Sequence, residues 1–159
     1  MKIKDFVSNF NILKPSIDSL MKNGGFSESF SNILLNDFSI VINHNEILDT
    51  SESLIDFLNI CNVNNLCVGK INFADSLNII DELNSIVIGG FDGGYLTRRK
   101  NEDSFIRIVY TDELENDELI FCETDDEFFR ILLLLTEYYS QTIQGESDEI
   151  SKTSKRIFK

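Results

Sequence analysis

The sequence is poor in several residue types, and each shortage excludes a class of protein. Only 14 of its 159 residues are lysine or arginine, against 27 aspartates and glutamates, so the formal charge is -13. A chain this acidic repels nucleic-acid phosphates and the headgroups of anionic membranes, so we predict neither a nucleic-acid partner nor a membrane partner. It does not repel a basic protein, because opposite charges raise association rates.

Histidine and cysteine, the usual ligands of transition metals, are also scarce. The chain has one histidine, His44, and three cysteines, Cys61, Cys67 and Cys122, which cannot all pair with one another. Their spacing matches no zinc pattern. We therefore predict reduced structural thiols, no bound metal and no cofactor.

Long apolar runs are absent as well. The longest run, Ile131 to Leu135, is far shorter than the roughly 20 residues that a membrane-spanning helix needs. The first residues, MKIKDFVSNF, lack the continuous apolar stretch of a secretory signal peptide. The sequence therefore predicts a cytoplasmic protein.

Apolar residues nevertheless make up 42% of the chain, enough for a hydrophobic core. At the usual domain size of roughly 100–150 residues, the length indicates one domain with a short tail. No large apolar face remains from Gln144 onward, and the charge there changes from acidic to basic. We assign residues 1–143 to the domain and predict a flexible tail over residues 144–159.

The N-terminal half predicts mainly helices. Apolar spacing indicates a helix over residues 3–22, which the single proline interrupts, and a shorter helix over residues 27–36. A third helix is predicted to end at Cys61, with Thr50 or Ser51 as its N-cap.

Strands and a further short helix are predicted between these helices and the C-terminal half. β-branched and apolar residues indicate strands over residues 38–43 and 66–73. Asp75 is predicted to cap a short helix that ends near Leu83.

The C-terminal half predicts strands joined by short turns, which makes neighbouring strands antiparallel. These strands cover residues 85–89, 95–99, 105–110 and 119–122. Thr124 and Glu127 fit a capping box, which opens a long closing helix. The predicted fold is α+β: a single antiparallel sheet flanked by helices, with the C-terminal helix on one face.

A group of glycines follows the first of these strands, at Gly89, Gly90, Gly93 and Gly94. Their spacing matches neither common phosphate-binding loop, and no helix N-terminus follows to hold a phosphate. We interpret all four as structural turn residues of a hairpin or bulge.

An acidic stretch without a basic residue runs from Asp112 to Glu127. A calcium loop fails here, because Leu114 stands where a ligand is needed and Asp117 where a glycine is needed. A solvated loop, a docking surface for a cationic protein and another metal site remain as interpretations. The residues predicted to contact a partner are Asp112, Glu113, Glu115, Asp117, Glu118, Asp125 and Asp126.

The two parts of this acidic set are predicted to lie apart. A loop between two strands and the helix that follows the second strand occupy opposite ends of that strand. The set would therefore form a broad acidic face and not a point site.

Catalytic motifs are not found in the sequence. There is no G-x-S-x-G elbow and no H-E-x-x-H pair, and His44 has no serine or cysteine beside it. We predict that the protein is not an enzyme.

Three segments resemble the SUKH superfamily, also called the SMI1/KNR4 family. Residues 53–60, SLIDFLNI, are similar to its short helix. Residues 86–96, IVIGGFDGGYL, are similar to its strand-turn-strand. Residues 105–110, with TDDEFF at 124–129, are similar to a further strand and its closing helix. The resemblance covers residues 51–140.

This resemblance implies a bacterial immunity protein, which sits in the cytosol and neutralises a polymorphic toxin by binding it. Such toxins are often nucleases, and a nuclease tends to be basic because it binds phosphates. The acidic composition agrees with such a partner. The alternative is a regulatory or scaffolding module of the same fold that binds other host proteins.

Overall fold

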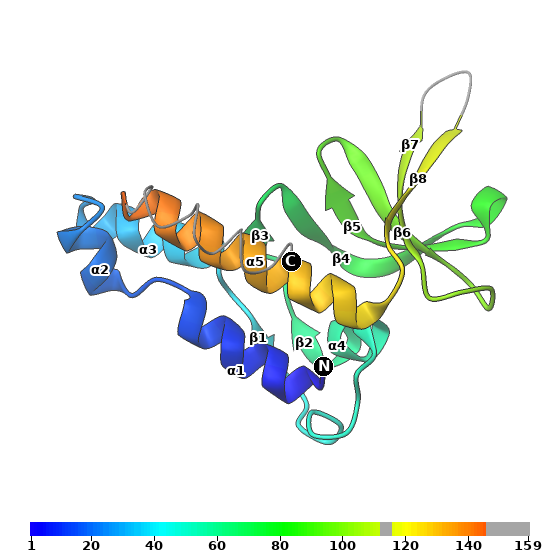
Figure 1. Cartoon of the computed structure of the whole chain (residues 1–159), viewed down its shortest axis with the longest axis horizontal. Coiled ribbons are helices and arrows are strands. Elements are labelled where there is room, and N and C mark those ends of the chain that lie inside the picture. The colour runs from blue at the N-terminus through cyan, green and yellow to red at the C-terminus, as the bar shows by residue number, and fades with distance from the viewer. Residues whose placement is uncertain (112–115, 146–159) are drawn as a thin grey trace.

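The computed structural model describes residues 1–111 and 116–145, which form an α+β fold (Figure 1). The helices of this part are α1 (Ile3–Leu13), α2 (Ile17–Lys22), α3 (Glu28–Asn36), α4 (Leu54–Ile60) and α5 (Asp125–Ile143). The strands are β1 (Val41–Ile42), β2 (Cys61–Asn62), β3 (Cys67–Val68), β4 (Ile71–Ile80), β5 (Ser85–Phe91), β6 (Gly94–Arg99), β7 (Ile106–Thr111) and β8 (Asn116–Cys122). A 3-10 turn, Asp81–Leu83, connects β4 to β5.

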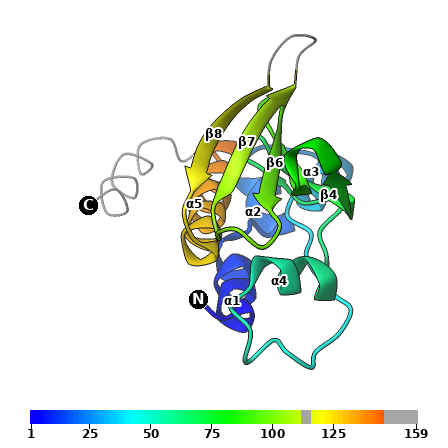
Figure 2. The same ribbon diagram turned by 90° about the vertical axis from the view of Figure 1, so that its right-hand side faces the viewer.

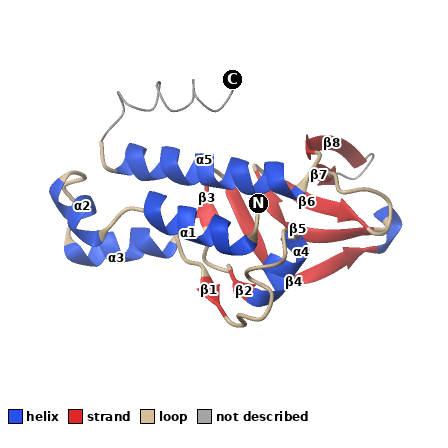
Figure 3. Ribbon diagram, turned by 60° about the horizontal axis from the view of Figure 1, so that its bottom comes forward, coloured by secondary structure: helices blue, strands red, loops and turns tan. Residues whose placement is uncertain are grey.

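The strands β3 to β8 form one six-stranded antiparallel sheet in sequence order (Figure 3). A separate two-stranded sheet joins β1 to β2. The predicted α+β class with antiparallel pairing is confirmed. The prediction of a single sheet is wrong for the described residues, because the end of α4 leads directly into a short strand that pairs with β1.

The N-terminal helices follow the apolar spacing of the sequence. α1 buries Ile3, Phe6, Val7 and Phe10, which recur along one face of the helix. Pro15 separates α1 from α2, as predicted, because proline has no N–H to continue the hydrogen-bond ladder.

The helices α4 and α5 each begin at a capping side chain. Ser53 caps α4 by accepting a hydrogen bond from the Asp56 N–H, so the prediction of Thr50 or Ser51 is wrong. Ser51 instead accepts a hydrogen bond from the Ser53 N–H. Thr124 caps α5 by accepting from the Glu127 N–H, as predicted.

Two predictions around β4 are wrong. A turn at Gly69 and Lys70, both with positive φ, divides the predicted strand 66–73 into β3 and the start of β4. The helix predicted from Asp75 is strand, because β4 continues to Ile80 and pairs with β5. The pairing shifts register between Phe73 and Asn78, and this irregularity interrupts the alternation that would have identified a strand.

The core lies between α1, α4, α5 and one face of the sheet. The rings of Phe6, Phe57 and Phe129 meet there, with centroids 4.8 to 5.6 Å apart. Phe128 packs edge-on against Phe73 of β4, which places α5 on this face as predicted. Among the described residues, no helix combines the length and apolar character needed to cross a membrane.

Candidate functional site

The predicted binding residues lie on and around the last pair of strands, β7 and β8. β8 is the outermost strand of the sheet, and among the described strands it pairs with β7 alone (Figure 2). Three predicted contact residues, Asp112, Glu113 and Glu115, fall outside the described residues. The remaining four can be placed individually.

Of the four predicted contact residues that the structure describes, Asp117 is the most available to a partner. It lies opposite Tyr110 near the start of β8 and is exposed to solvent. The structure gives it no ion pair with another described residue. Its carboxylate can therefore act on a cationic partner.

Glu118 is already engaged inside the molecule. Its carboxylate binds Arg99 of β6 at 2.8 Å and Arg107 of β7 at 3.0 Å. Two further acids complete this group, because Arg99 also pairs with Glu102 and Arg107 with Asp103. Three carboxylates therefore neutralise two arginines, and Glu118 connects three neighbouring strands. Its predicted contact with a partner protein stays a prediction, but its charge is already balanced inside the molecule.

The Arg107–Asp103 pair has a marked effect on the titration of both groups. The Arg107 guanidinium donates to both Asp103 oxygens, at 2.9 and 2.6 Å. This hydrogen bonding lowers the pKa of Asp103 from 3.8 to about 2, and it raises the pKa of Arg107. Asp103 is therefore ionised across the neutral range.

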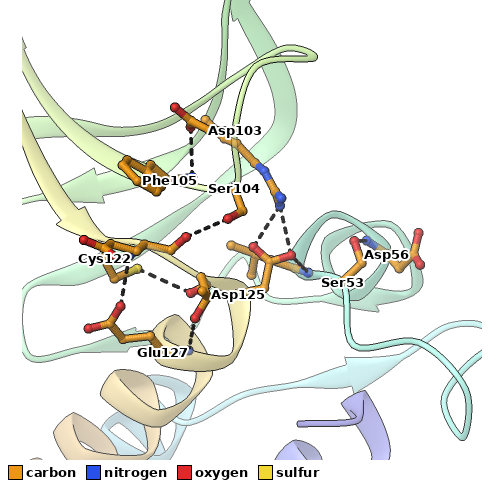
Figure 4. A network of polar contacts seen from close by, with 12 residues as sticks. Ser53, Asp56, Asp103, Ser104, Phe105, Cys122, Asp125 and Glu127 are labelled. Atoms are coloured by element: carbon orange, nitrogen blue, oxygen red, sulfur yellow. Dashed lines mark hydrogen bonds and ion pairs between the residues drawn. The ribbon is translucent and has the colours of Figure 1, made fainter.

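Asp125 is a structural residue that joins three elements (Figure 4). Its oxygens accept two hydrogen bonds from Arg98 of β6, at 2.8 and 2.9 Å. One of them also accepts the Leu54 N–H of α4 at 3.0 Å. Its side chain is 15% exposed. Asp125 therefore ties the sheet and α4 to the start of α5, and little of its charge reaches solvent.

Asp126 is more exposed than Asp125 but also has internal partners. It forms ion pairs with the ammonium group of Met1 and with Arg130 on the next turn of α5. Both pairs reduce its attraction for an outside cation. Both aspartates at the start of α5 therefore have partners inside the molecule, and their contact with a partner protein stays a prediction.

The separation of the two acidic groups agrees with the sequence argument. Asp117 lies near the start of β8, and Asp125 follows the end of that strand (Figure 1). Exposed acids without an ion pair to a described residue lie at both ends of β8, with Asp117 near its start and Glu123 and Glu127 just beyond its end.

The exposed apolar residues of β8 were not predicted as part of a site. Leu119 is 58% exposed and Ile120 is 59% exposed. Leu119 lies opposite Ile108 and Ile120 opposite Arg107. Successive strand residues point to opposite faces, so β8 presents one exposed apolar side chain on each face. The sequence signal was the pair of apolar residues directly after two acids, in Asp117–Ile120.

The glycines predicted as turn residues have different roles. Gly93 lies in the two-residue β5–β6 turn with a φ of +87°, beside Asp92 at +47°. Gly89 and Gly90 belong to β5, and Gly94 begins β6. Gly89 is needed for strand packing, because a Cβ there would lie 2.0 Å from the main-chain oxygen of Asn72. The four glycines are therefore not all turn residues.

The groups considered for metal binding or catalysis do not come together. All three cysteines are free, and burial raises the pKa of Cys61 to about 11 and of Cys122 to about 12. His44 is exposed in the loop after β1. Within residues 1–111 and 116–145, no group of three or more potential ligand side chains is placed to hold a metal.

Comparisons with protein families, curated proteins and solved structures found no match to this chain.

Proposed function

We propose that this chain is a non-catalytic immunity protein of the SUKH type, which binds a basic toxin domain in the cytoplasm and neutralises it. The observation that carries the proposal is the surplus of acidic charge around β8. The arginines on this part of the sheet are held by internal carboxylates, whereas Asp117 is exposed. The formal charge of -13 adds a long-range field of the same sign.

Such a surface suits inhibition by binding. A toxin that acts on a polyanion needs a basic substrate site, and an acidic protein can occupy that site without chemistry of its own. Charge complementarity also accelerates the encounter, which matters when the toxin must be stopped before it acts. The resemblance of residues 51–140 to the SUKH family supports the same role.

Co-expression with a candidate basic toxin domain, to be sought among the genes beside this one, tests the proposal. We expect the toxin domain alone to stop bacterial growth and this chain to restore it. The purified proteins should form a complex that survives size-exclusion chromatography. The matched control is Phe129→Asp, which places a charge at a fully buried position and should abolish folding and rescue together.

Failure to restore growth while a folded chain is present would contradict the immunity role. A growth or cell-wall defect on deletion of the gene, in cells without the toxin, would instead favour a regulatory module of the same fold.

A further inference from the structure

The free edge of β8 has main-chain bonding groups that no described strand uses. An edge strand presents a row of N–H and C=O groups to solvent, and another extended chain can pair with them. β8 is seven residues long, whereas β3 at the opposite edge has two. At that opposite edge β3 covers only Ile71 and Asn72 of β4, and the rest of β4 is interrupted by a register shift between Phe73 and Asn78. β8 therefore provides an edge of seven residues, and the uncovered part of β4 is a second, irregular edge.

We propose that this edge of β8 binds an extended, basic segment of the partner protein, which adds to the sheet as a further strand. The inference rests on the proposed function and specifies how the partner is held. Main-chain hydrogen bonds would supply affinity, and the side chains of β8 would supply specificity.

Protection of this edge against pairing is weak. Proteins often block an edge strand with proline or lysine, and Asn116–Cys122 contains neither. A register shift lies at the Ile106 end of the β7–β8 pair, away from Asn116. The exposed Leu119 and Ile120 lie on opposite faces. An added strand would cover part of both side chains, so pairing would also bury apolar surface.

The acidic charge of this chain favours a basic segment as the added strand. Asp117 is an exposed carboxylate of β8 without an ion pair to a described residue, so a lysine or arginine on the added strand would find an opposite charge beside it. A second copy of this chain is a poorer occupant, because each copy carries a charge of -13 and brings Asp117 and Glu118 on the pairing strand. The partner segment is therefore basic, with apolar residues between its charges.

Short peptides test the inference without the toxin. The probe is acetyl-Lys-Val-Lys-Ile-Lys-Val-Lys-amide, and its control carries N-methyl groups on consecutive central amides. Both peptides have the same charge and side chains, but the control cannot pair along either edge. We expect the unmodified peptide to bind the full chain about tenfold more tightly by titration calorimetry, because the control loses main-chain hydrogen bonds. Amide hydrogen exchange in β8 should slow with the unmodified peptide alone.

A pair of matched double variants locates the site. Leu119→Lys/Ile120→Lys places repelling charges on both faces of β8 and should weaken peptide binding by about tenfold or more. The control is Ile12→Lys/Ile33→Lys, which alters two exposed isoleucines on α1 and α3 by the same charge. It should weaken binding much less, and circular dichroism should show that both variants are folded.

Several results would overturn strand addition. If both peptides bind with the same affinity, the interaction depends on charge and not on main-chain pairing. The same conclusion follows if the two double variants lose the same amount of affinity. A concentration-dependent dimer that disappears in Leu119→Lys/Ile120→Lys would make a second copy the occupant. Peptide binding only after removal of residues 146–159 would make this C-terminal segment the occupant of the edge. None of these results would stop the chain from restoring growth in the presence of the toxin. The proposed function is therefore tested separately, by co-expression.

Discussion

At the scale of single residues, the contacts of a carboxylate decide its role more than its place in an acidic stretch does. Asp117 and Glu118 are neighbours in β8, yet Asp117 is exposed and Glu118 holds two arginines. Asp125 is bonded to Arg98 and to the main chain of α4. Fewer carboxylates are therefore available at the surface than the acidic stretch of the sequence contains.

Asp125→Ala should destabilise the fold. The change leaves Arg98 and the Leu54 N–H without their shared acceptor at a site that is largely removed from solvent. We expect the free energy of unfolding in urea to fall by about 2–3 kcal/mol. Asp126→Ala is the control, with a loss of about 1 kcal/mol or less because its side chain is 40% exposed. Equal losses of unfolding free energy in the two variants would show that Asp125 does not stabilise the contact between α5, β6 and α4.

Asp103 should contribute to stability in a defined pH window. Its pKa is depressed to about 2 in the folded protein, because Arg107 bonds its ionised form. The folded state therefore binds this proton more weakly than the unfolded state. The resulting stability is present above about pH 4 and is lost as the pH falls toward about 2.

Urea unfolding of Asp103→Asn across this range checks the effect. Asparagine keeps an oxygen for the Phe105 N–H but loses the charge. The variant should be less stable than wild type at neutral pH, and the difference should shrink as the pH falls below about 4. A difference independent of pH would contradict this account.

At the scale of elements, sequence patterns correctly predicted the features that depend only on neighbouring residues. The face of α1, the break at Pro15 and the Thr124 cap of α5 depend on neighbouring residues, and they were predicted. The second half of β4 depends on pairing with β5, which no local window contains. A helix was therefore predicted there, and Gly69 was not recognised as a turn.

The glycines of the β5–β6 hairpin should differ in their tolerance of a side chain. Gly93→Val should cost about 1–2 kcal/mol in urea unfolding, because valine is strained at positive φ. Gly93→Asn is the control and should cost less, since asparagine tolerates this conformation better. Gly89→Val should cost more than Gly93→Val, because its Cβ would meet the main chain of Asn72. The reverse order would contradict the placement of these two residues.

At the scale of the whole molecule, the net charge was readable from composition, but its distribution was not. Arg98 pairs with Asp125 of α5, and Arg99 and Arg107 each pair with Glu118 of β8. These three ion pairs join different elements, so they depend on the assembled fold. The edge position of β8 depends likewise on strand order. Sequence patterns could therefore suggest an acidic binder but could not identify its open edge.

If the proposed function holds, charge reversal around the start of β8 should slow association with the proposed toxin partner. We would change Asp112, Glu113, Glu115 and Asp117 to lysine, and leave Glu118 intact because it holds Arg99 and Arg107. Stopped-flow measurements at low salt should show a much lower association rate for the variant than for wild type. Added salt should narrow the difference between the two rates, because it screens long-range charge interactions. The matched control changes the exposed acids Asp18, Glu28, Glu46 and Glu52 to lysine. Equal slowing in both variants would assign the effect to net charge alone.

The packing of α1 against α5 affects how the chain is made. Phe6 near the start of the chain needs Phe129 near its end, whereas each strand of the large sheet pairs with its neighbour in sequence. During synthesis the successive hairpins can form as they leave the ribosome, because they require only nearby residues. The first helix must wait for the last. Its apolar face can pack against Phe57 once α4 is made, but it lacks Phe129 until α5 emerges, so the core closes fully only then.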